Sequence, residues 1–468
     1  MALAYFRPRS IDATRELTLK GGRILAGGQS LMPLVNRGDV RPEVLIDINR
    51  LEGLDHIALR GGQLEIGALV RLERVRTDPL VRAHAPLLAA ALAWVANPGV
   101  RQRGTLVGNA VAAPPGAEAV AALVLQGASL VLAGASGDAP AEVSPGSVPD
   151  GAFATAVRLP LAVRGTRAGF FEVQRRFGHL GLVGAGVMTE PDGRWSVVLT
   201  NLTDAPLVAS ALAESVARGA LDDASLRAAL DIDLAGRIPR EDLHATARYR
   251  REVAPEVVRR AVERLWTGVE GPVHGTSATA SGAGAAAEPF AVNSSSSRGS
   301  ESSATEFVDG PAIVALTVDG EPRTLTSDAR TTLAESLDLR IGCAEGVCGA
   351  CTVALDDKPV RACLILTPQA DGCRVDTVKS LARLEGAADG ADRLTPLQRH
   401  LRERQAFQCG WCLSGLLVGT ACFLRGRERA EGSEIAMHLV GHLCRCLASA
   451  GVMDAIEDLL HERRGGEP

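Results

Sequence analysis

Cysteine is absent from the first 342 residues, and aromatic residues make up only 3% of the 468-residue chain. So few aromatic side chains argue against a base-stacking surface for nucleic acid. The net charge of −5 and the pI of about 6.0 show no basic excess for nucleic acid or an acidic membrane surface. The longest apolar run, residues 85–96, is too short to span a bilayer, and the first ten residues contain no apolar signal segment. We therefore expect a cytoplasmic protein with no membrane span and no nucleic-acid partner.

The chain divides into two globular regions joined by a linker. Hydrophobic residues make up 46% of the sequence, and 468 residues are too many for one core. Residues 268–310 are rich in glycine, alanine and serine, which predicts a flexible linker. All ten cysteines follow this linker. In a large chain without a secretory signal, this clustering favours metal binding over a disulfide framework.

Hydrophobic periodicity predicts mixed secondary structure, and therefore an α+β multidomain protein. In the first region we expect strands at 23–26, 44–48 and 64–66, and helices at 86–95, 119–125, 207–218 and 255–265. In the second region, Asp319-Gly320 predicts a hairpin between strands 313–318 and 323–325. A helix at 331–337, a hairpin at 352–364 and helices at about 396–405, 412–425, 434–440 and 452–463 should follow.

Four cysteines form the pattern C-x4-C-x2-C-x11-C within and after the segment GCAEGVCGACTV: Cys343, Cys348, Cys351 and Cys363. The first three match the spacing of plant-type [2Fe–2S] proteins, in which a later element supplies the fourth ligand. Gly342, Gly346 and Gly349 let the backbone wrap tightly, so that N–H groups can point at the sulfur atoms. A zinc site and reduced structural thiols are the alternatives.

A second set has the pattern C-x2-C-x31-C-x-C: Cys409, Cys412, Cys444 and Cys446. The first pair leads into one predicted helix and the second pair precedes another. Free N–H groups at a helix start favour an anionic thiolate cluster. The spacing alone leaves zinc open as well as iron–sulfur.

The segments GCAEGVCGACTV, QCGWC and LCRC, in this order, resemble the two-cluster iron–sulfur subunit of the molybdenum hydroxylases. That family includes xanthine dehydrogenase, aldehyde oxidoreductase and aerobic carbon monoxide dehydrogenase. The resemblance covers residues 311 to about 463. It implies that the first cysteine set holds the [2Fe–2S] cluster nearer the flavin and the second set holds the cluster nearer the molybdenum cofactor. Gln408 matches a glutamine that touches the pterin of that cofactor.

The iron–sulfur half departs from the family pattern beside the ligands. Leu413-Ser414 replaces Thr-Pro, His442 replaces asparagine, and Leu447-Ala448-Ser449 replaces Thr-Gly-Tyr. The eight ligand positions are intact, so these changes bear on the fit to the large subunit and on the cluster potential. Cys373 and Cys422 match no ligand position, and we interpret them as buried free thiols.

Two glycine-containing segments in the first region could approach a nucleotide closely. RILAGGQSLMPL, residues 23–34, is interpreted as strand, glycine turn and helix, a geometry that suits a pyrophosphate. The second segment, residues 100–118, contains Gly104, Thr105, Gly108 and Asn109. An ordinary left-handed turn is the alternative for the first segment. No G-x-G-x-x-G motif with a following acid supports a Rossmann site.

Together with LIDINR at 45–50, these segments resemble the FAD-binding subunit of the same family, over residues 1 to about 252. The resemblance places the FAD pyrophosphate on Ala26, Gly27, Gly28, Gln29, Ser30 and Leu31. It places Thr105, Gly108 and Asn109 against the flavin and its ribityl chain, and Glu118 at an acid that binds the ribityl hydroxyls. Two departures, Val107 for a glycine and His179 for an acid, bear on FAD affinity.

The two resemblances define the expected domains. They are an FAD-binding domain (1–165), a flavoprotein C-terminal α+β domain (166–267), the linker (268–310), a β-grasp plant-type ferredoxin domain (311–385) and a helical-bundle [2Fe–2S] domain (386–468).

By resemblance, the chain is an electron-transfer oxidoreductase subunit. It would pass electrons from a molybdenum cofactor on a large partner subunit through two [2Fe–2S] clusters to FAD. NAD, a quinone or another external acceptor would then be reduced, within a dimer of heterodimers. No side chain is expected to act as a catalytic acid, base or nucleophile. The alternative is a self-sufficient NAD(P)H-dependent iron–sulfur flavoprotein reductase that serves another partner.

Overall fold

The structure is a computed structural model that describes residues 3–134, 141–176, 178–269, 271, 306–308, 311–386 and 394–465. Within these ranges the strands form four sheets, and helices cover or extend them. None of the helices in these ranges combines the length and the apolar character that a bilayer crossing requires. The mixture of helices and sheets confirms the predicted α+β multidomain class.

The first sheet has the strand order β13-β1-β3-β2. The strands are β1 (Ala4–Arg7), β2 (Arg23–Leu25), β3 (Val44–Asp47) and β13 (Glu306–Val308), with helices α1 (Ile11–Leu19) and α2 (Leu31–Arg37). β1 and β2 both pair in parallel with β3, whereas β13 pairs antiparallel with β1. Residues 306–308 fall inside the predicted linker, but the open edge of β1 offers hydrogen-bonding groups that order them as a strand.

The second sheet, β4-β5-β8-β6-β7, forms the main body of the first region with a set of short helices. The strands are β4 (Ile57–Arg60), β5 (Gln63–Gly67), β6 (Ser129–Leu132), β7 (Glu142–Val143) and β8 (Ala154–Pro160). The helices are α3 (Leu72–Thr77), α4 (Pro79–His84), α5 (Pro86–Leu92), α6 (Pro98–Arg101), α7 (Leu106–Ala112) and α8 (Glu118–Leu125).

The third sheet, β12-β11-β10-β9, is antiparallel. It contains β9 (Arg167–Gln174), β10 (Gly181–Thr189), β11 (Trp195–Thr200) and β12 (Leu207–Val208), with helices α9 (Ser210–Ala217), α10 (Asp223–Asp233) and α11 (Ala247–Thr267). The predicted helix 207–218 was wrong at its start, because Leu207 and Val208 pair with β11. The predicted helix 255–265 is part of the longer α11, in which the Thr246 side chain caps the first turn.

The fourth sheet, β15-β14-β18-β16-β17, follows the linker. Its strands are β14 (Ala312–Val318), β15 (Glu321–Ser327), β16 (Thr352–Leu355), β17 (Lys358–Arg361) and β18 (Arg374–Asp376), accompanied by α12 (Leu333–Ser336) and three 3-10 turns, η1 (Ala362–Leu364), η2 (Thr367–Ala370) and η3 (Val378–Ser380). Both predicted hairpins are present, but the second strand of the second hairpin begins at Lys358, and residues 362–364 form η1 instead of ending that strand. Asp319 and Gly320 have φ angles of 52° and 88°, as a two-residue hairpin turn requires.

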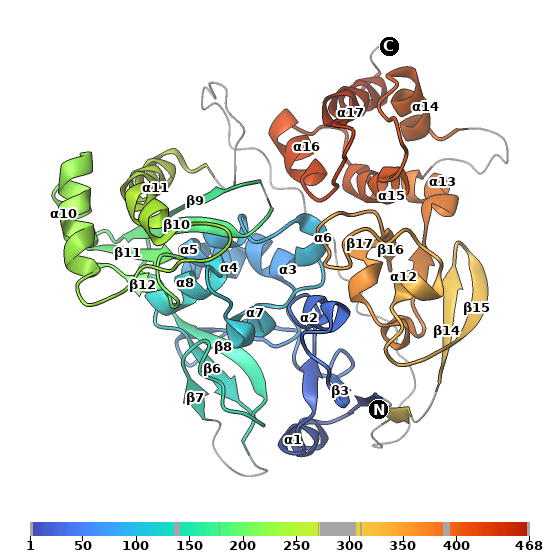
Figure 1. Cartoon of the computed structure of the whole chain (residues 1–468), viewed down its shortest axis with the longest axis horizontal. Coiled ribbons are helices and arrows are strands. Elements are labelled where there is room, and N and C mark those ends of the chain that lie inside the picture. Colours follow the sequence, from blue (N-terminus) through green and yellow to red (C-terminus); the bar gives the residue numbers. More distant parts are fainter. Residues whose placement is uncertain are drawn as a thin grey trace.

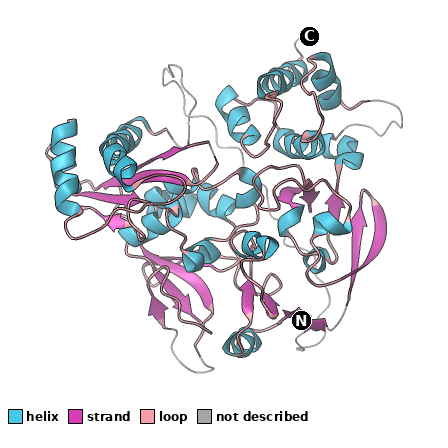
Figure 2. Cartoon of the chain, viewed as in Figure 1, coloured by secondary structure: helices cyan, strands magenta, loops and turns pink. Residues whose placement is uncertain are grey.

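The C-terminal part of the described chain consists of helices alone (Figure 2). They are α13 (Leu381–Glu385), α14 (Pro396–Glu403), α15 (Leu413–Leu424), α16 (Gly432–Leu439) and α17 (Ser449–Arg463). The last four lie where the sequence predicted four helices. Thr395 caps α14 by accepting from the Gln398 N–H at 3.3 Å, as Thr-Pro at a helix start predicts.

The two regions on either side of the linker share a hydrophobic core. Side chains of the first sheet, including Tyr5, Leu25 and Leu45, pack in one cluster with Val314 and Val353 of the fourth sheet. In Figure 1 the fourth sheet lies beside α2 and α6, and the C-terminal helices lie above it. The cysteine-containing region is therefore joined to the first region by buried contacts as well as by the chain.

Candidate functional site

The first cysteine set begins on the loop between α12 and β16. Gly346 and Gly349 have φ angles of 78° and 76°, which glycine adopts without strain, so the backbone wraps around Cys343. Three backbone N–H groups donate to Cys343 Sγ at 3.3–3.4 Å, from Glu345, Val347 and Cys348. The thiol of Cys348, together with these amides, lowers the pKa of Cys343 to about 5. The loop therefore stabilises a thiolate at Cys343 before any metal is considered.

The four thiols of the first set are arranged in two pairs. The Cys343 thiol interacts with the Cys348 thiol, and the Cys351 thiol interacts with that of Cys363, in η1. The second interaction lowers the pKa of Cys351 to about 7 and raises the pKa of Cys363. The charge of Cys343 acts on both members of the other pair, so the two pairs are neighbours.

The second cysteine set is also arranged in two pairs, and the pairs cross between chain segments. The Cys409 thiol interacts with the Cys446 thiol, and the thiol of Cys412, at the start of α15, interacts with that of Cys444. The backbone N–H of Trp411 and the Cys446 thiol lower the pKa of Cys409. Burial, with the charge of Cys444, raises the pKa of Cys412 to about 11.

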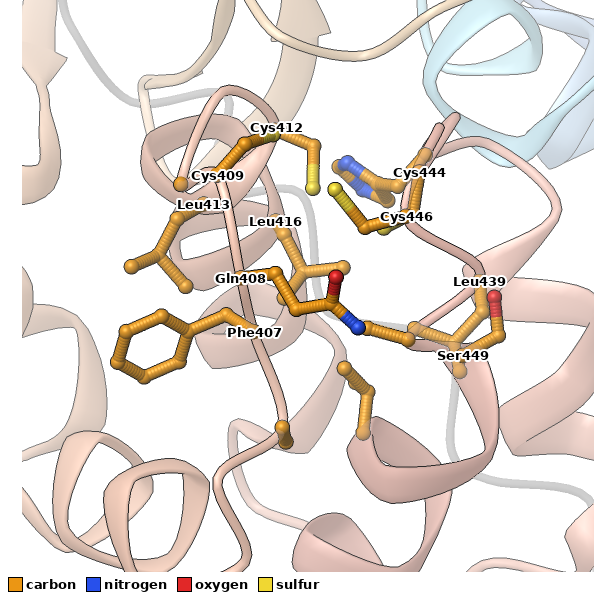
Figure 3. A pocket seen from close by; sticks show the side chains of 15 residues that line it. Phe407, Gln408, Cys409, Cys412, Leu413, Leu416, Leu439, Cys444, Cys446 and Ser449 are labelled. Atoms are coloured by element: carbon orange, nitrogen blue, oxygen red, sulfur yellow. The ribbon is translucent and has the colours of Figure 1, made fainter.

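All four thiols of the second set line one pocket between α15 and the segment that precedes α17. Figure 3 shows Cys412, Cys444 and Cys446 converging on one side of this pocket, while the Gln408 side chain reaches into it. Gln408 and Cys409 are exposed at the surface. The exposed rim also carries Phe407 and Trp411, which are 39% and 46% exposed. The second set is therefore open to an approaching molecule on one side.

In the described part of the chain, no three or more His, Cys, Asp and Glu side chains form a group that could hold a metal ion by themselves. In both sets the thiols are instead arranged as two interacting pairs. Cys373 and Cys422 belong to neither set, and burial raises the pKa of each thiol to about 12.

One buried arginine connects the first cysteine set to its surroundings. Arg361 is only 3% exposed, and the charges of all four thiols of the set act on it. Its Nε donates to the carbonyl oxygen of Gly346 at 3.2 Å, and its Nη1 donates to the Thr352 hydroxyl. Its Nη2 donates to Asn97 Oδ1 at 3.0 Å and to the Gly441 carbonyl oxygen at 2.6 Å. Arg361 therefore touches the first region, the fourth sheet's loop and the C-terminal helices.

His442 lies between the two cysteine sets. A Cβ at Gly349, in the loop of the first set, would lie 2.7 Å from His442 Nδ1, and the His442 side chain also lines the pocket of the second set. The next residue, Leu443, donates its backbone N–H to the Cys348 carbonyl oxygen at 2.8 Å. His442 and Leu443 therefore connect the loop of the first set to the pocket of the second set.

The two glycine-containing segments of the first region meet in space. A Cβ at Gly27 would overlap the carbonyl oxygen of Arg103, and a Cβ at Gly104 would lie 3.6 Å from the Gln29 side chain. Asn49, from the LIDINR segment, donates to the Ala26 carbonyl oxygen at 2.8 Å and accepts from Arg71 at 2.7 Å. The fold therefore brings together the three segments on which the resemblance to an FAD-binding subunit was based.

Two amide oxygens in this cradle are buried and form no hydrogen bond with any described residue: Gln29 Oε1 and Asn109 Oδ1. Thr105 caps α7 by accepting from the Gly108 N–H at 3.1 Å. Ser30 and Leu31 lie at the start of α2, and the Ser30 hydroxyl makes no cap hydrogen bond. Gly28, with a φ of 74°, lies so close to the fourth sheet's region that its Cβ would be 3.1 Å from the Leu364 carbonyl oxygen.

Glu118 begins α8 and is paired with a second buried acid, Glu172 on β9. Burial raises the pKa of Glu118 to about 7, and burial and the Glu118 charge raise the pKa of Glu172. Glu172 Oε2, Thr200 Oγ1 and Asn201 Oδ1 are buried oxygens without a hydrogen-bond partner in the described chain. The predicted acid thus lies in a buried polar region that the sequence did not reveal.

The two departures in the first region have different locations. Val107 points into the hydrophobic core and is 3% exposed, which places its side chain among core residues. His179 lies near His244, with ring centroids 6.5 Å apart, and burial and the Arg176 charge lower its pKa. Phe177 of the same segment lies outside the described residues.

The sequence missed Arg361, Asn97 and Glu172 as parts of these sites. Arg361 stands two residues before a ligand cysteine, a position that could have drawn attention to it. Asn97 and Glu172 carry no local signal, because their partners lie far away in the sequence.

Family models match both ends of the chain. Residues 1–160 match the FAD binding domain in molybdopterin dehydrogenase, and residues 383–457 match a [2Fe-2S] binding domain.

Relatives of two kinds match nearly their full lengths. The nicotine 6-hydroxylase small subunit of Paenarthrobacter nicotinovorans is 38% identical over 148 residues, covering 30% of this chain and 85% of the relative. The carbon monoxide dehydrogenase medium chain of Hydrogenophaga pseudoflava is 30% identical over 283 residues, covering 56% of this chain and 96% of the relative. A solved Cu,Mo-CO dehydrogenase chain is 29% identical with a TM-score of 0.52, covering 57% of this chain and 98% of that chain.

Proposed function

Since the chain belongs to the family of molybdenum hydroxylase subunits, we propose that it is a fused electron-transfer subunit with one FAD and two [2Fe–2S] clusters. It would serve a partner that carries the molybdenum cofactor. One observation carries the proposal: eight of the ten cysteines meet in two separate sets, and each set consists of two thiol pairs.

The paired arrangement fits [2Fe–2S] clusters better than zinc. A structural zinc ion takes four ligands around one centre. A [2Fe–2S] cluster needs two thiolates for each iron, because bridging sulfides complete the coordination. We assign Cys343 with Cys348 and Cys351 with Cys363 to the two irons of a cluster in a β-grasp, plant-type ferredoxin domain.

The second set would hold the other cluster, in a helical-bundle domain. Its pairs are Cys409 with Cys446 and Cys412 with Cys444. The three N–H donors on Cys343 and the Trp411 N–H beside Cys409 supply the backbone dipoles that such anionic clusters require.

The glycine cradle fits FAD. The unpartnered Gln29 Oε1 and Asn109 Oδ1 are buried acceptors that ligand hydroxyl or N–H groups can satisfy. Gly27 and Gly108 leave room where a Cβ would meet Arg103 or Thr105. Ala26 to Leu31 would line the pyrophosphate, Thr105, Gly108 and Asn109 the flavin and ribityl chain, and Glu118 the ribityl hydroxyls.

When bound, the clusters carry single electrons and the flavin exchanges one or two, which allows a two-electron oxidation at molybdenum to be coupled to an external acceptor. The chain's own residues set the spacing, burial and hydrogen bonding of these groups. The order from the partner inward would be the second set, the first set, then the flavin cradle. A Cβ at Gly28 would lie 3.1 Å from the carbonyl oxygen of Leu364, the residue after Cys363, which supports this order.

The exposed pocket of the second set is the expected docking face for a large molybdenum-cofactor subunit, with Gln408 directed to the pterin. Relatives are named as subunits of dehydrogenase complexes, which supports a partnered assembly. We propose a dimer of heterodimers with NAD, a quinone or another acceptor. The large subunit would choose the substrate.

The proposal is tested by expressing the chain with and without a candidate large subunit and following substrate-dependent reduction of a dye. We expect substrate-dependent dye reduction only with the partner present. NADH–dye reductase activity of the isolated chain at a comparable rate would instead indicate a self-sufficient reductase. A zinc-loaded, colourless protein would refute both.

A further inference from the structure

The buried charge of Arg361 has no carboxylate partner. No Asp or Glu among the described residues forms an ion pair or a hydrogen bond with its guanidinium. Its hydrogen-bond partners are two carbonyl oxygens, an amide oxygen and a hydroxyl. Neutral acceptors solvate a cation but do not balance its charge, and an unbalanced buried charge is costly.

Other buried arginines in the chain are balanced differently. Arg101, which is 5% exposed, forms an ion pair with Glu73 at 2.7 Å. Arg250, which is fully buried, pairs with Asp242 at 2.7 Å. Arg361 instead lies among four thiols, and the charges of Cys351, Cys363, Cys348 and Cys343 all act on it. The negative groups that act most strongly on Arg361 therefore all belong to this cysteine set.

We propose that Arg361 is a positioning residue that acts as the counter-ion of the cluster on the first cysteine set and raises its reduction potential above that of the same cluster without the buried charge. The inference rests on the proposed function, since it requires a cluster at Cys343, Cys348, Cys351 and Cys363. The second set is not expected to respond, because the four thiols that act most strongly on Arg361 all belong to the first set.

The sign of the effect follows from charge. A [2Fe–2S] cluster with four thiolates is a dianion when oxidised, and one added electron makes it a trianion without a bond breaking or a proton being taken up. A fixed positive charge stabilises the more negative state more strongly, and its effect is large where water is excluded. Arg361 is held in place from three sides, by Asn97, Thr352 and Gly441, so it cannot move away to solvent.

The contacts of Arg361 also make its charge hard to displace. A Cβ at Gly99 would lie 2.8 Å from Arg361 Cζ, and a Cβ at Gly441 would lie 2.5 Å from its Nη2. Two chain segments thus approach the guanidinium so closely that a side chain at either glycine would require the guanidinium to shift. This packing explains why a planar, five-donor cation rather than a flexible lysine suits the position.

The test is a reductive titration of the iron-loaded full chain, with the two cluster signals followed separately by electron paramagnetic resonance. In Arg361→Met we expect the reduced-to-oxidised ratio of the first-set cluster to fall about tenfold at a fixed potential, which is a shift of about −59 mV for one electron. The second-set signal should stay at its original midpoint. Arg361→Lys, which keeps the charge, should change the first midpoint much less than Arg361→Met.

Two further variants keep the test decisive. Asn97→Asp places a carboxylate where Arg361 already donates at 3.0 Å and removes the Asn97 Nδ2 donor to the Gly346 carbonyl oxygen, so neutralising the cation should lower the same midpoint without replacing Arg361. Arg101→Met is the matched control, a buried arginine with its own carboxylate, and should leave both midpoints unchanged.

An unchanged first-set midpoint in iron-loaded Arg361→Met would overturn the inference while leaving the two-cluster function intact. Equal shifts in Arg361→Lys and Arg361→Met would also overturn it, because geometry rather than charge would then be responsible. If Arg361→Met loses iron, the Asn97→Asp variant provides the test instead. An unshifted midpoint of the first-set cluster in that variant would reject the counter-ion role of Arg361. Failure of the wild-type chain to show two signals would instead reject the proposed function itself.

Discussion

The side-chain amide of Asn36 donates a hydrogen bond to the carbonyl oxygen of Cys363 at 3.0 Å, across 327 positions of sequence. The same amide donates to the Ala344 carbonyl oxygen at 2.7 Å. Asn36 lies on α2, the helix that follows the glycine turn, and Cys363 is a proposed cluster ligand. One side chain therefore ties the proposed pyrophosphate loop to both ends of the first cysteine set.

Replacing Asn36 should loosen this connection. Asn36→Ala leaves two carbonyl oxygens without their donor, and we expect a loss of about 1–3 kcal/mol of unfolding free energy. The cluster-to-flavin electron-transfer rate in stopped-flow experiments should fall as well. Arg37→Gln is the neighbouring control, because it removes only exposed ion pairs, with Glu345 and Asp39, and should leave stability and rate close to wild type. If Asn36→Ala keeps the wild-type electron-transfer rate and the wild-type stability, the hydrogen bonds of Asn36 do not connect the pyrophosphate loop to the first cysteine set in a functional way.

Single ligand replacements should remove the clusters one at a time. Cys363→Ser should abolish one resonance signal and Cys444→Ser the other, with iron falling from about four to about two atoms per chain. Cys373→Ser and Cys422→Ser are matched controls, because neither thiol belongs to a pair in the described structure. Loss of both signals from one ligand replacement, with the fold intact by circular dichroism, would contradict two independent pockets.

The glycine cradle should not tolerate a methyl group at Gly27. A Cβ there would overlap the Arg103 carbonyl oxygen and separate the two loops, so Gly27→Ala should lower the FAD content of purified protein about tenfold. Gly432→Ala is the control, because its Cβ would meet only the Glu457 side chain at 3.6 Å. Full FAD occupancy in purified Gly27→Ala protein would show that the close contact between the Gly27 and Arg103 loops is not needed for FAD binding.

The buried acid pair predicts a pH dependence of stability in the flavin-free chain. Because the folded-state pKa of Glu118 is raised to about 7 from 4.5, its favourable contribution is present below about pH 4.5 and is lost as the pH rises through 7. The difference is on the order of 3 kcal/mol. Glu118→Gln should therefore match wild type near pH 4.5 and exceed it in stability at pH 8.

Thermal unfolding between pH 4.5 and 8 measures this effect. The exposed Glu16→Gln variant serves as the control and should keep the wild-type pH profile. If Glu118→Gln shows the wild-type profile too, the acid pair is not a source of pH-dependent instability.

Local signals in the sequence predicted the elements that depend on them. The Asp319-Gly320 turn, the Thr395 cap and the spacing of Cys343 and Cys348 each act within a few residues, and each is present in the structure. The glycine turn at Gly27 and Gly28 was also recognisable, because close approach leaves glycine as the residue that fits.

What the sequence could not predict depends on long-range pairing. The role of Arg361 depends on its hydrogen bonds to Asn97 and Gly441, which lie 264 and 80 positions away in the sequence. Hydrophobic periodicity in the sequence does not indicate contacts of such long range. Leu207 and Val208 looked helical because they continue into α9, but pairing with β11 overrides that preference. β13 lies in a region of linker-like composition, and pairing with the edge of β1 orders it as a strand.

The proposal of two [2Fe–2S] clusters is tested most directly by the electron paramagnetic resonance spectrum of the anaerobically reduced chain, quantified against its iron and zinc contents. Eight thiols in two paired sets predict two separable [2Fe–2S] signals, each integrating to about one spin, with about four irons per chain. One signal with half that iron, or zinc in place of iron, would contradict it.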